Sequence, residues 1–395
     1  MPPPPIDPRL YNPSFRFRGK EIARILHCWG QGDSVLLTGI RRTGKTELLK
    51  AALYRYANQG FSVGLLDVMD YNSLPRFYQD LLELILSKMP PNLTAQLNGL
   101  LKSAVGIPDV VAQWVRKQIN EINVGGVEAK LNPPSEQLLR YWQPLVTQLE
   151  TLLADARTRN IVLPVIGIDE LPCMMENLLR EGVQAKEIEL MLASLRKLRA
   201  AGLRTIVAGS ISFENLLSLN GISHRVLGEF SRHSIPPFTR AEAEIFLRDA
   251  LVGLPAGENA AIALVLDTLP DYVPNFLSRD TIPYLMICKD LAACEASLHQ
   301  EILPAIRRGF LYQFQERLDK NYNPQELQMA GQILDAIARG PAQGSRIDGT
   351  QLPPEHQRVL LKLQYDNFIM DTTDFQWCFS LNLIRQWWRA QRGMA

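Results

Sequence analysis

Short apolar runs alternate with helical patterns through the first half of the chain. Runs typical of buried strands lie at residues 34–38, 61–68, 161–168 and 205–208. Because Pro164 cannot donate a hydrogen bond inside a ladder, the third strand should begin after it. Strands that alternate with helices predict an α/β fold whose parallel sheet is covered on both faces.

Between these runs, apolar residues recur at the spacing of one helix face. The spacing predicts helices over residues 17–29, 48–56, 78–89, 135–157 and 185–200. The segment from 92 to 135 is less regular. Within it we expect a helical piece at 110–119 and a small hairpin around Gly125 and Gly126.

The pattern changes after Pro236 and Pro237. Thr239 and Glu242 form the capping-box signature that precedes an amphipathic helix, and strand-like runs are nearly absent until about residue 366. The middle of the chain should therefore form a helical domain.

The last part of the chain from Pro324 onward has a third pattern. It predicts helices at 325–338 and 355–365, two strands around Asp371–Asp374 and a final helix at 381–391. Helices followed by a hairpin suggest a winged helix. The expected organisation is a lead with a first helix (1–33), an α/β core (34–237) with an irregular insertion (92–135), a helical lid (238–323) and a winged-helix-like domain (324–395).

Composition narrows the class of protein. A chain of 395 residues with 46% hydrophobic and 21% charged residues can build two or three globular domains. Its formal net charge of +1 means that any contact with nucleic acid must come from a local patch. The five cysteines form no C-x-x-C pair, which argues against zinc and against a disulfide framework. Residues 1–5 lack the apolar run of a signal peptide and no run approaches a membrane span, so we expect a cytoplasmic protein without membrane contact.

The segment Gly39–Thr46 has the spacing G-x-x-x-x-G-K-T between a predicted strand and a predicted helix. Chance would produce these four fixed positions in roughly one or two of a hundred chains of this length. Gly39 and Gly44 allow backbone N–H groups to point inward at an anion, at the positive end of the next helix. Lys45 would reach the β- and γ-phosphates, and Thr46 would ligate Mg²⁺. The alternative is a basic surface turn, which leaves the flanking strand and helix unexplained.

The nucleotide-binding residues predicted from this loop extend one position into the following helix. They are Gly39, Arg41, Arg42, Thr43, Gly44, Lys45, Thr46 and Glu47.

A second acidic site follows the third apolar strand. Asp169 is placed to hold Mg²⁺, and Glu170 is placed to orient or deprotonate the attacking water. The alternative is an ordinary acidic pair at a strand end. Ser210, after the fourth strand, could contact the γ-phosphate or the water, although a simple turn serine is nearly as good an interpretation.

The identity of the nucleotide and of a transition-state arginine is less directly encoded. No N-K-x-D motif for guanine occurs, so ATP is favoured. Arg225 and Arg232 lie between the last core strands and the helical domain, where an arginine could stabilise the transferred phosphoryl group. Arginines at a surface or a domain interface are an equally good explanation.

These motifs together resemble those of archaeal-type ATPases of the STAND division, close to AAA+ proteins. The resemblance rests on residues 17–21 before the first strand, the basic phosphate loop, the Ile-Asp-Glu at the second acidic strand and the Arg-Gln-Trp-Trp of the last helix. It implies a P-loop core with a helical lid and a winged helix, and an ATP-driven switch that assembles with a protein partner or with itself. Relatives of this kind act in antiviral defence or in mobile elements. Hydrolysis would be slow or stimulated by the partner.

An alternative is a DNA-associated ATPase of the origin-binding or transposition type, with the winged helix on duplex DNA. Arg385, Arg389 and Arg392 line the last helix, with Trp387 and Trp388 between them. Tryptophans at this spacing more often anchor a terminal helix to its core, and the near-neutral charge disfavours strong binding to phosphate.

Overall fold

The computed structural model describes most of the chain, and the described residues form two compact units. These residues are 7–12, 15, 17–103, 107–108, 111–117, 135–209, 212–340, 347–348, 352–371 and 376–394. Unit 1 comprises Met1–Thr38, Lys45–Ser210 and Leu216–Ser234. Unit 2 comprises Gly39–Gly44, Ile211–Asn215 and Ile235–Ala395.

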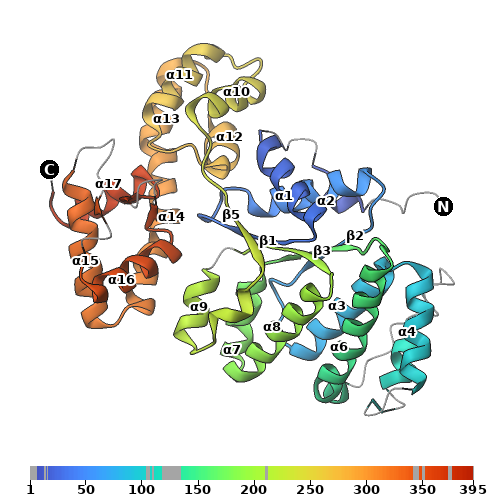
Figure 1. Ribbon diagram of the computed structural model, residues 1–395. Helices are drawn as coiled ribbons and strands as arrows, with labels where there is room; N and C mark the ends of the chain where they lie inside the picture. The colour runs from blue at the N-terminus through green and yellow to red at the C-terminus, as the bar shows by residue number, and fades with distance from the viewer. Residues whose placement is uncertain are drawn as a thin grey trace. The chain divides into compact units, whose positions relative to one another are not determined.

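Unit 1 contains the predicted parallel sheet, which has five strands in the order β2-β3-β4-β1-β5 (Figure 1). The strands are β1 (Ser34–Thr38), β2 (Val63–Asp67), β3 (Val165–Asp169), β4 (Arg204–Val207) and β5 (Phe230–Ser234). As predicted, β3 begins directly after Pro164. Strand β5 was not predicted because Phe230–Ser234 carries little apolar character; it forms through its parallel register with β1.

Helices cover both faces of this sheet. The helices in this part of the chain are α1 (Gly19–Gln31), α2 (Lys45–Asn58), α3 (Leu74–Lys88), α4 (Pro91–Ser103), α6 (Ser135–Thr158), α7 (Leu171–Arg180), α8 (Ala185–Ala200) and α9 (Phe213–Leu219), with the 3₁₀ turns η1 (Pro8–Leu10) and η2 (His224–Leu227). A Cβ added at Gly167 would lie 2.8 Å from Leu53 of α2, whereas one added at Gly64 would lie 2.8 Å from Leu84 of α3. Since Gly64 pairs with Ile166 in the neighbouring strand, α2 and α3 pack on opposite faces.

The segment expected to be irregular is partly regular. Residues 91–103 form α4, which was not predicted and whose leucines at positions 93, 97 and 101 are buried. The helical piece expected at 110–119 is present over residues 111–117. The leucine spacing was hidden by Pro, Asn and Gly residues, which individually disfavour a helix. The hairpin expected around Gly125 and Gly126 lies outside the described residues.

The middle of unit 2 is helical, as predicted. Its elements are α10 (Arg240–Ala250), α11 (Glu258–Thr268), the π-helix η3 (Phe276–Thr281), α12 (Ile282–Leu285), α13 (Leu291–Ser297), the π-helix η4 (Leu298–Ile302) and α14 (Leu303–Asn321). The predicted capping box is present: the Thr239 side chain accepts from the backbone N–H of Glu242, and the Glu242 carboxylate accepts from that of Thr239.

The rest of unit 2 has the predicted succession of helices, hairpin and final helix. It consists of α15 (Pro324–Arg339), β6 (Ile347–Asp348), α16 (Pro354–Tyr365), β7 (Ile369–Asp371), β8 (Gln376–Phe379) and α17 (Asn382–Gln391). The three strands form an antiparallel sheet in the order β6-β8-β7. The two-residue strand β6 was not predicted, since so short an edge carries no periodicity.

Among the described residues, no helix is long and apolar enough to cross a membrane.

Candidate nucleotide-binding site

The backbone of the glycine loop has the unusual conformation that an anion-binding loop needs. Residues 39–44 connect β1 to α2, and φ is +123° at Gly39, +75° at Arg42 and +87° at Gly44. A Cβ at Gly39 would also lie 2.8 Å from the carbonyl oxygen of Ile235. Glycine at position 39 is therefore required both by conformation and by space.

Thr43 and Arg42 fix the conformation of the glycine loop through contacts within unit 2. The Thr43 side chain is buried and its hydroxyl donates to the carbonyl of Ile40 at 2.9 Å. The Arg42 guanidinium pairs with Asp280 of η3 at 3.4 Å, and the Arg42 carbonyl accepts from the N–H of Asn275 at 3.4 Å. Arg41, in contrast, is exposed. Thr43 and Arg42 therefore support the shape of the loop.

In unit 1, the start of α2 lies beside the end of β3. Lys45 is the first residue of α2 and is only 7% exposed. The next side chain, Thr46, hydrogen-bonds to the carboxylate of Asp169, which is 3% exposed. The structure thus brings together two residues predicted to hold Mg²⁺ that lie far apart in the sequence.

The Asp169 carboxylate lies in an environment that disfavours its charge. Burial raises the pKa of Asp169 to about 6, and the nearby Glu170 and Asp67 carboxylates act in the same direction. Hydrogen bonds from Thr46 and from the Glu170 backbone N–H oppose this shift. A nearby cation would stabilise the ionised form.

Asp67 is a neighbour that the sequence analysis missed. It ends β2, is paired in register with Asp169 of β3, and is exposed. Asp67 lies inside the apolar run predicted over residues 61–68, whereas Asp169 follows the run at 161–168, so the sequence did not mark Asp67 as the end of a strand. What the sequence did not provide was the pairing of these two strands.

Glu170 begins the connection from β3 to α7 in a left-handed conformation, with φ at +59°. Its N–H donates to Asp169 Oδ1 at 3.1 Å, and its side chain is partly exposed. Left-handed backbone in a non-glycine residue is uncommon and is often found at functional sites. The conformation directs Glu170 away from the path of an extended strand, and its role as the base stays a prediction.

The remaining predicted residues have different surroundings. The Glu47 carboxylate accepts a hydrogen bond from the Asn12 side chain. Arg225 is exposed in η2. Arg232 was expected after the last strand of the core, but it lies within β5, where it is exposed and pairs with Leu36 of β1. Ser210 lies outside the described residues.

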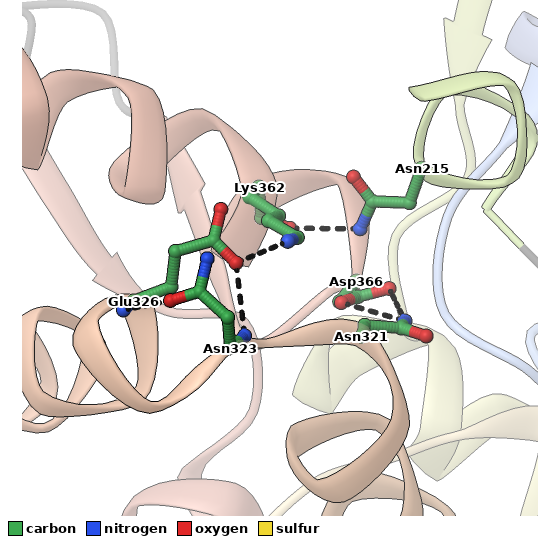
Figure 2. Close-up of polar contacts among 6 residues, drawn as sticks. All are labelled: Asn215, Asn321, Asn323, Glu326, Lys362 and Asp366. Carbon is green, nitrogen blue, oxygen red and sulfur yellow. Dashed lines mark hydrogen bonds and ion pairs between the residues drawn. The ribbon is translucent and has the colours of Figure 1, made fainter. Parts of the chain in front are cut away.

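A polar cluster in unit 2 holds the segment that follows β4. Figure 2 shows Asn215 facing the end of α16, where its Nδ2 donates to the carbonyl of Lys362 at 3.1 Å. The Asp366 carboxylate nearby accepts from Asn321 Nδ2 at 3.1 Å on each oxygen, and the Asp366 carbonyl accepts from Arg317 at 2.6 Å. Burial raises the pKa of Asp366, while the charge of Arg317 and the hydrogen bonds oppose this.

A neighbouring ion pair extends this cluster along α15 and α16. Lys362 Nζ lies 2.8 Å from the Glu326 carboxylate, which also accepts from the N–H of Asn323 at the start of α15 (Figure 2). The members come from three separate stretches of the chain (215, 317–326 and 362–366), so no single sequence motif marks the whole cluster.

The sequence matches no protein-family model and no curated protein. Among solved structures, the chain is similar to the Walker-type ATPase PABY2304 of Pyrococcus abyssi, with a TM-score of 0.52 and 18% identity over 95% of this chain and 96% of that one. It also matches the ADP form of the ORC2 protein of Aeropyrum pernix, with a TM-score of 0.42 and 13% identity over 98% and 97% of the two chains. The similarity to the Pyrococcus protein shows that the fold is that of a P-loop ATPase.

Proposed function

We propose that this chain binds ATP with Mg²⁺, hydrolyses it, and uses the nucleotide state to control its conformation and its assembly with a partner. The observation that carries the proposal is the pairing of Thr46 with the buried Asp169 next to Lys45. The glycine loop with its left-handed residues leads directly into these residues. A surface turn would not need a buried lysine or a buried carboxylate.

The residues fit a magnesium nucleotide. The Thr46 hydroxyl and the Asp169 carboxylate are hard oxygen ligands of the kind that Mg²⁺ prefers, and the carboxylate is buried, so it gains from a cation. Mg²⁺, when bound, neutralises charge on the β- and γ-phosphates. Lys45 would contact those phosphates, and the N–H groups of residues 39–44 would surround them.

Glu170 is proposed as the group that orients or deprotonates the attacking water. Its carboxylate adjoins Asp169 in sequence but is the more exposed of the two, so water can reach it. Ser210, Arg225 and Arg232 remain weaker candidates for contacts with the γ-phosphate or the transition state.

A switch of the STAND or AAA+ type is supported by the contacts of two loops with helices of unit 2. Arg42 of the glycine loop pairs with Asp280, and Asn215 after β4 bonds to Lys362. We propose that a change at the γ-phosphate alters these two loops and thereby the helices attached to them. A role in antiviral defence or in a mobile element rests only on the resemblance of the motifs.

The arginines first proposed for the DNA-associated alternative are engaged in contacts within unit 2. The buried Arg385 donates to the carbonyls of Ala338 and Gly340, and Arg389 donates to Ala338 as well. Arg392 pairs with Asp335 at 3.3 Å. These three arginines stabilise the end of α15, so a duplex would have to compete for them or use another surface.

The proposal is tested by ATP affinity and turnover in matched variants. Lys45→Ala should abolish measurable ATP binding, whereas Lys50→Ala, five residues further along α2, should retain it. Glu170→Gln should bind ATP normally and lose turnover by about 100-fold or more, the size expected for a general base. The exposed Glu181→Gln, at the other end of α7, should match the wild type. Unchanged binding in Lys45→Ala would overturn the proposal, and turnover stimulated by duplex DNA would favour the alternative.

A further inference from the structure

A groove of about 490 Å³ is lined by residues of α14 and α17 in unit 2. Its floor is apolar and contains Leu311 of α14 and Leu383 of α17, which are buried. Large aromatic side chains line it from both helices: Tyr312, which is 72% exposed, and Trp387, which is partly exposed. Little of the Tyr312 ring is buried in the folded chain, so its apolar surface is available to a partner.

The charge of the groove is one-sided. Arg307 and Arg308 line it from α14, and both are exposed. Within the described part of the chain, neither guanidinium makes a hydrogen bond or an ion pair. The other polar residues of the described lining are glutamines, with no lysine, aspartate or glutamate among them.

This composition is that of a protein-binding surface. Tyrosine, tryptophan and arginine are enriched at interfaces and dominate their binding energy, whereas lysine and acidic residues are depleted. Single-stranded nucleic acid fits less well, because it needs cations spaced along its backbone. Here the two cations are neighbours on one helix.

The two sides of α17 have different roles. The side carrying Trp388 packs on α15, where Trp388 Nε1 donates to Asp335 at 2.8 Å. The side carrying Leu383 and Trp387 lines the groove. Trp388 therefore anchors α17 to α15, whereas Trp387 lines the groove.

We infer that the groove between α14 and α17 binds a short acidic segment of a partner protein, which inserts apolar side chains between the helices and places carboxylates against Arg307 and Arg308. The inference rests on the proposed nucleotide switch for its purpose and names the class of its partner. Helix α14 connects the two features, because a Cβ added at its Gly309 would lie 3.9 Å from the Arg42 guanidinium of the glycine loop.

The test begins with a random library of short displayed peptides, selected on the full chain without nucleotide. The enriched peptides should carry acidic residues together with a leucine or an aromatic residue. Their Kd, measured by fluorescence anisotropy, should rise at least about tenfold in Arg308→Glu and in Tyr312→Ser. The control Lys289→Glu, an exposed site between α12 and α13, should change it less than about twofold. Tyr312→Ser is included because Tyr312 is largely exposed, so its replacement should not impair folding.

Other occupants give other results. The inference would be overturned if the enriched peptides bound Arg308→Glu and Tyr312→Ser as tightly as they bind the wild type. It would also be overturned if the selection enriched basic peptides. Binding of an oligo-dT strand that Arg308→Glu abolishes would assign the groove to nucleic acid. Self-association that the same variant abolishes would assign it to a second copy of the chain. The Kd of the peptides is measured without nucleotide and again in Lys45→Ala. A wrong assignment of the groove can therefore be told apart from a wrong assignment of the ATP site.

Discussion

Asp271 should make the stability of unit 2 depend on pH. Its carboxylate accepts from the backbone N–H groups of Asn382 at 2.9 Å and Leu383 at 2.7 Å, so it caps α17 from a distant part of the sequence. Burial raises the pKa of Asp271 from its ordinary value of 3.8 to about 6, although the two hydrogen bonds oppose this. The folded protein therefore binds the proton more tightly than the unfolded chain does.

The sign and size of the effect follow from this difference. The stabilisation due to the protonated carboxyl is fully present below the unfolded pKa and is lost as pH rises through the folded pKa. Between about pH 4.5 and about pH 7.5, the free energy of unfolding should fall by about 2 kcal/mol through this group. In Asp271→Asn the side-chain carbonyl can still accept a hydrogen bond, but nothing titrates.

The assay is urea unfolding of wild type and Asp271→Asn at steps across that pH range, followed by tryptophan fluorescence. The advantage of the wild type over the variant should be largest at low pH and shrink by about 2 kcal/mol towards neutrality. An advantage that instead grows with pH would show that the helix N-terminus stabilises the ionised form more than burial disfavours it, and would refute the reasoning.

Three further predictions follow from individual contacts. Gly39→Ala should reduce ATP affinity at least about tenfold in a nucleotide titration, because its Cβ meets backbone at 2.8 Å in a strained conformation; normal affinity would mean that the loop can relax. Gly167→Ala should lower the free energy of unfolding by about 1–3 kcal/mol, because its Cβ would overpack the core. Gly99→Ala on α4, where a Cβ meets nothing within 4 Å, should raise the free energy of unfolding by about 0.5–1 kcal/mol. Equal effects of the two changes in chemical denaturation would contradict the packing argument. Asn321→Ala should cost about 1.5–3 kcal/mol, measured in the same way, because it removes the two hydrogen bonds that Asn321 Nδ2 donates to the buried Asp366 carboxylate. A neutral result would mean that other donors replace them.

The elements of the core were predictable because their signals are local. An apolar run such as 34–38, the proline at 164 and the capping box at Thr239 each act within a few residues, and each is present as predicted. The P-loop spacing belongs to the same class, since strand, loop and helix follow one another along the chain.

Elements without a local signal were missed. Strand β5 depends on the neighbouring edge of β1, and α4 buries leucines among residues that disfavour helices. The placement of Arg232 inside a strand follows from the first of these.

The sequence alone determined which residues carry the chemistry: a lysine and a threonine after a glycine loop, and an acidic pair after a strand. Only the tertiary structure decided their surroundings. The order of the strands places Asp67 beside Asp169, and folding brings Asn215 to Lys362 and removes Arg385 from solvent. The physical reason is distance along the chain, because burial and strand pairing between remote segments leave no periodic trace in either segment.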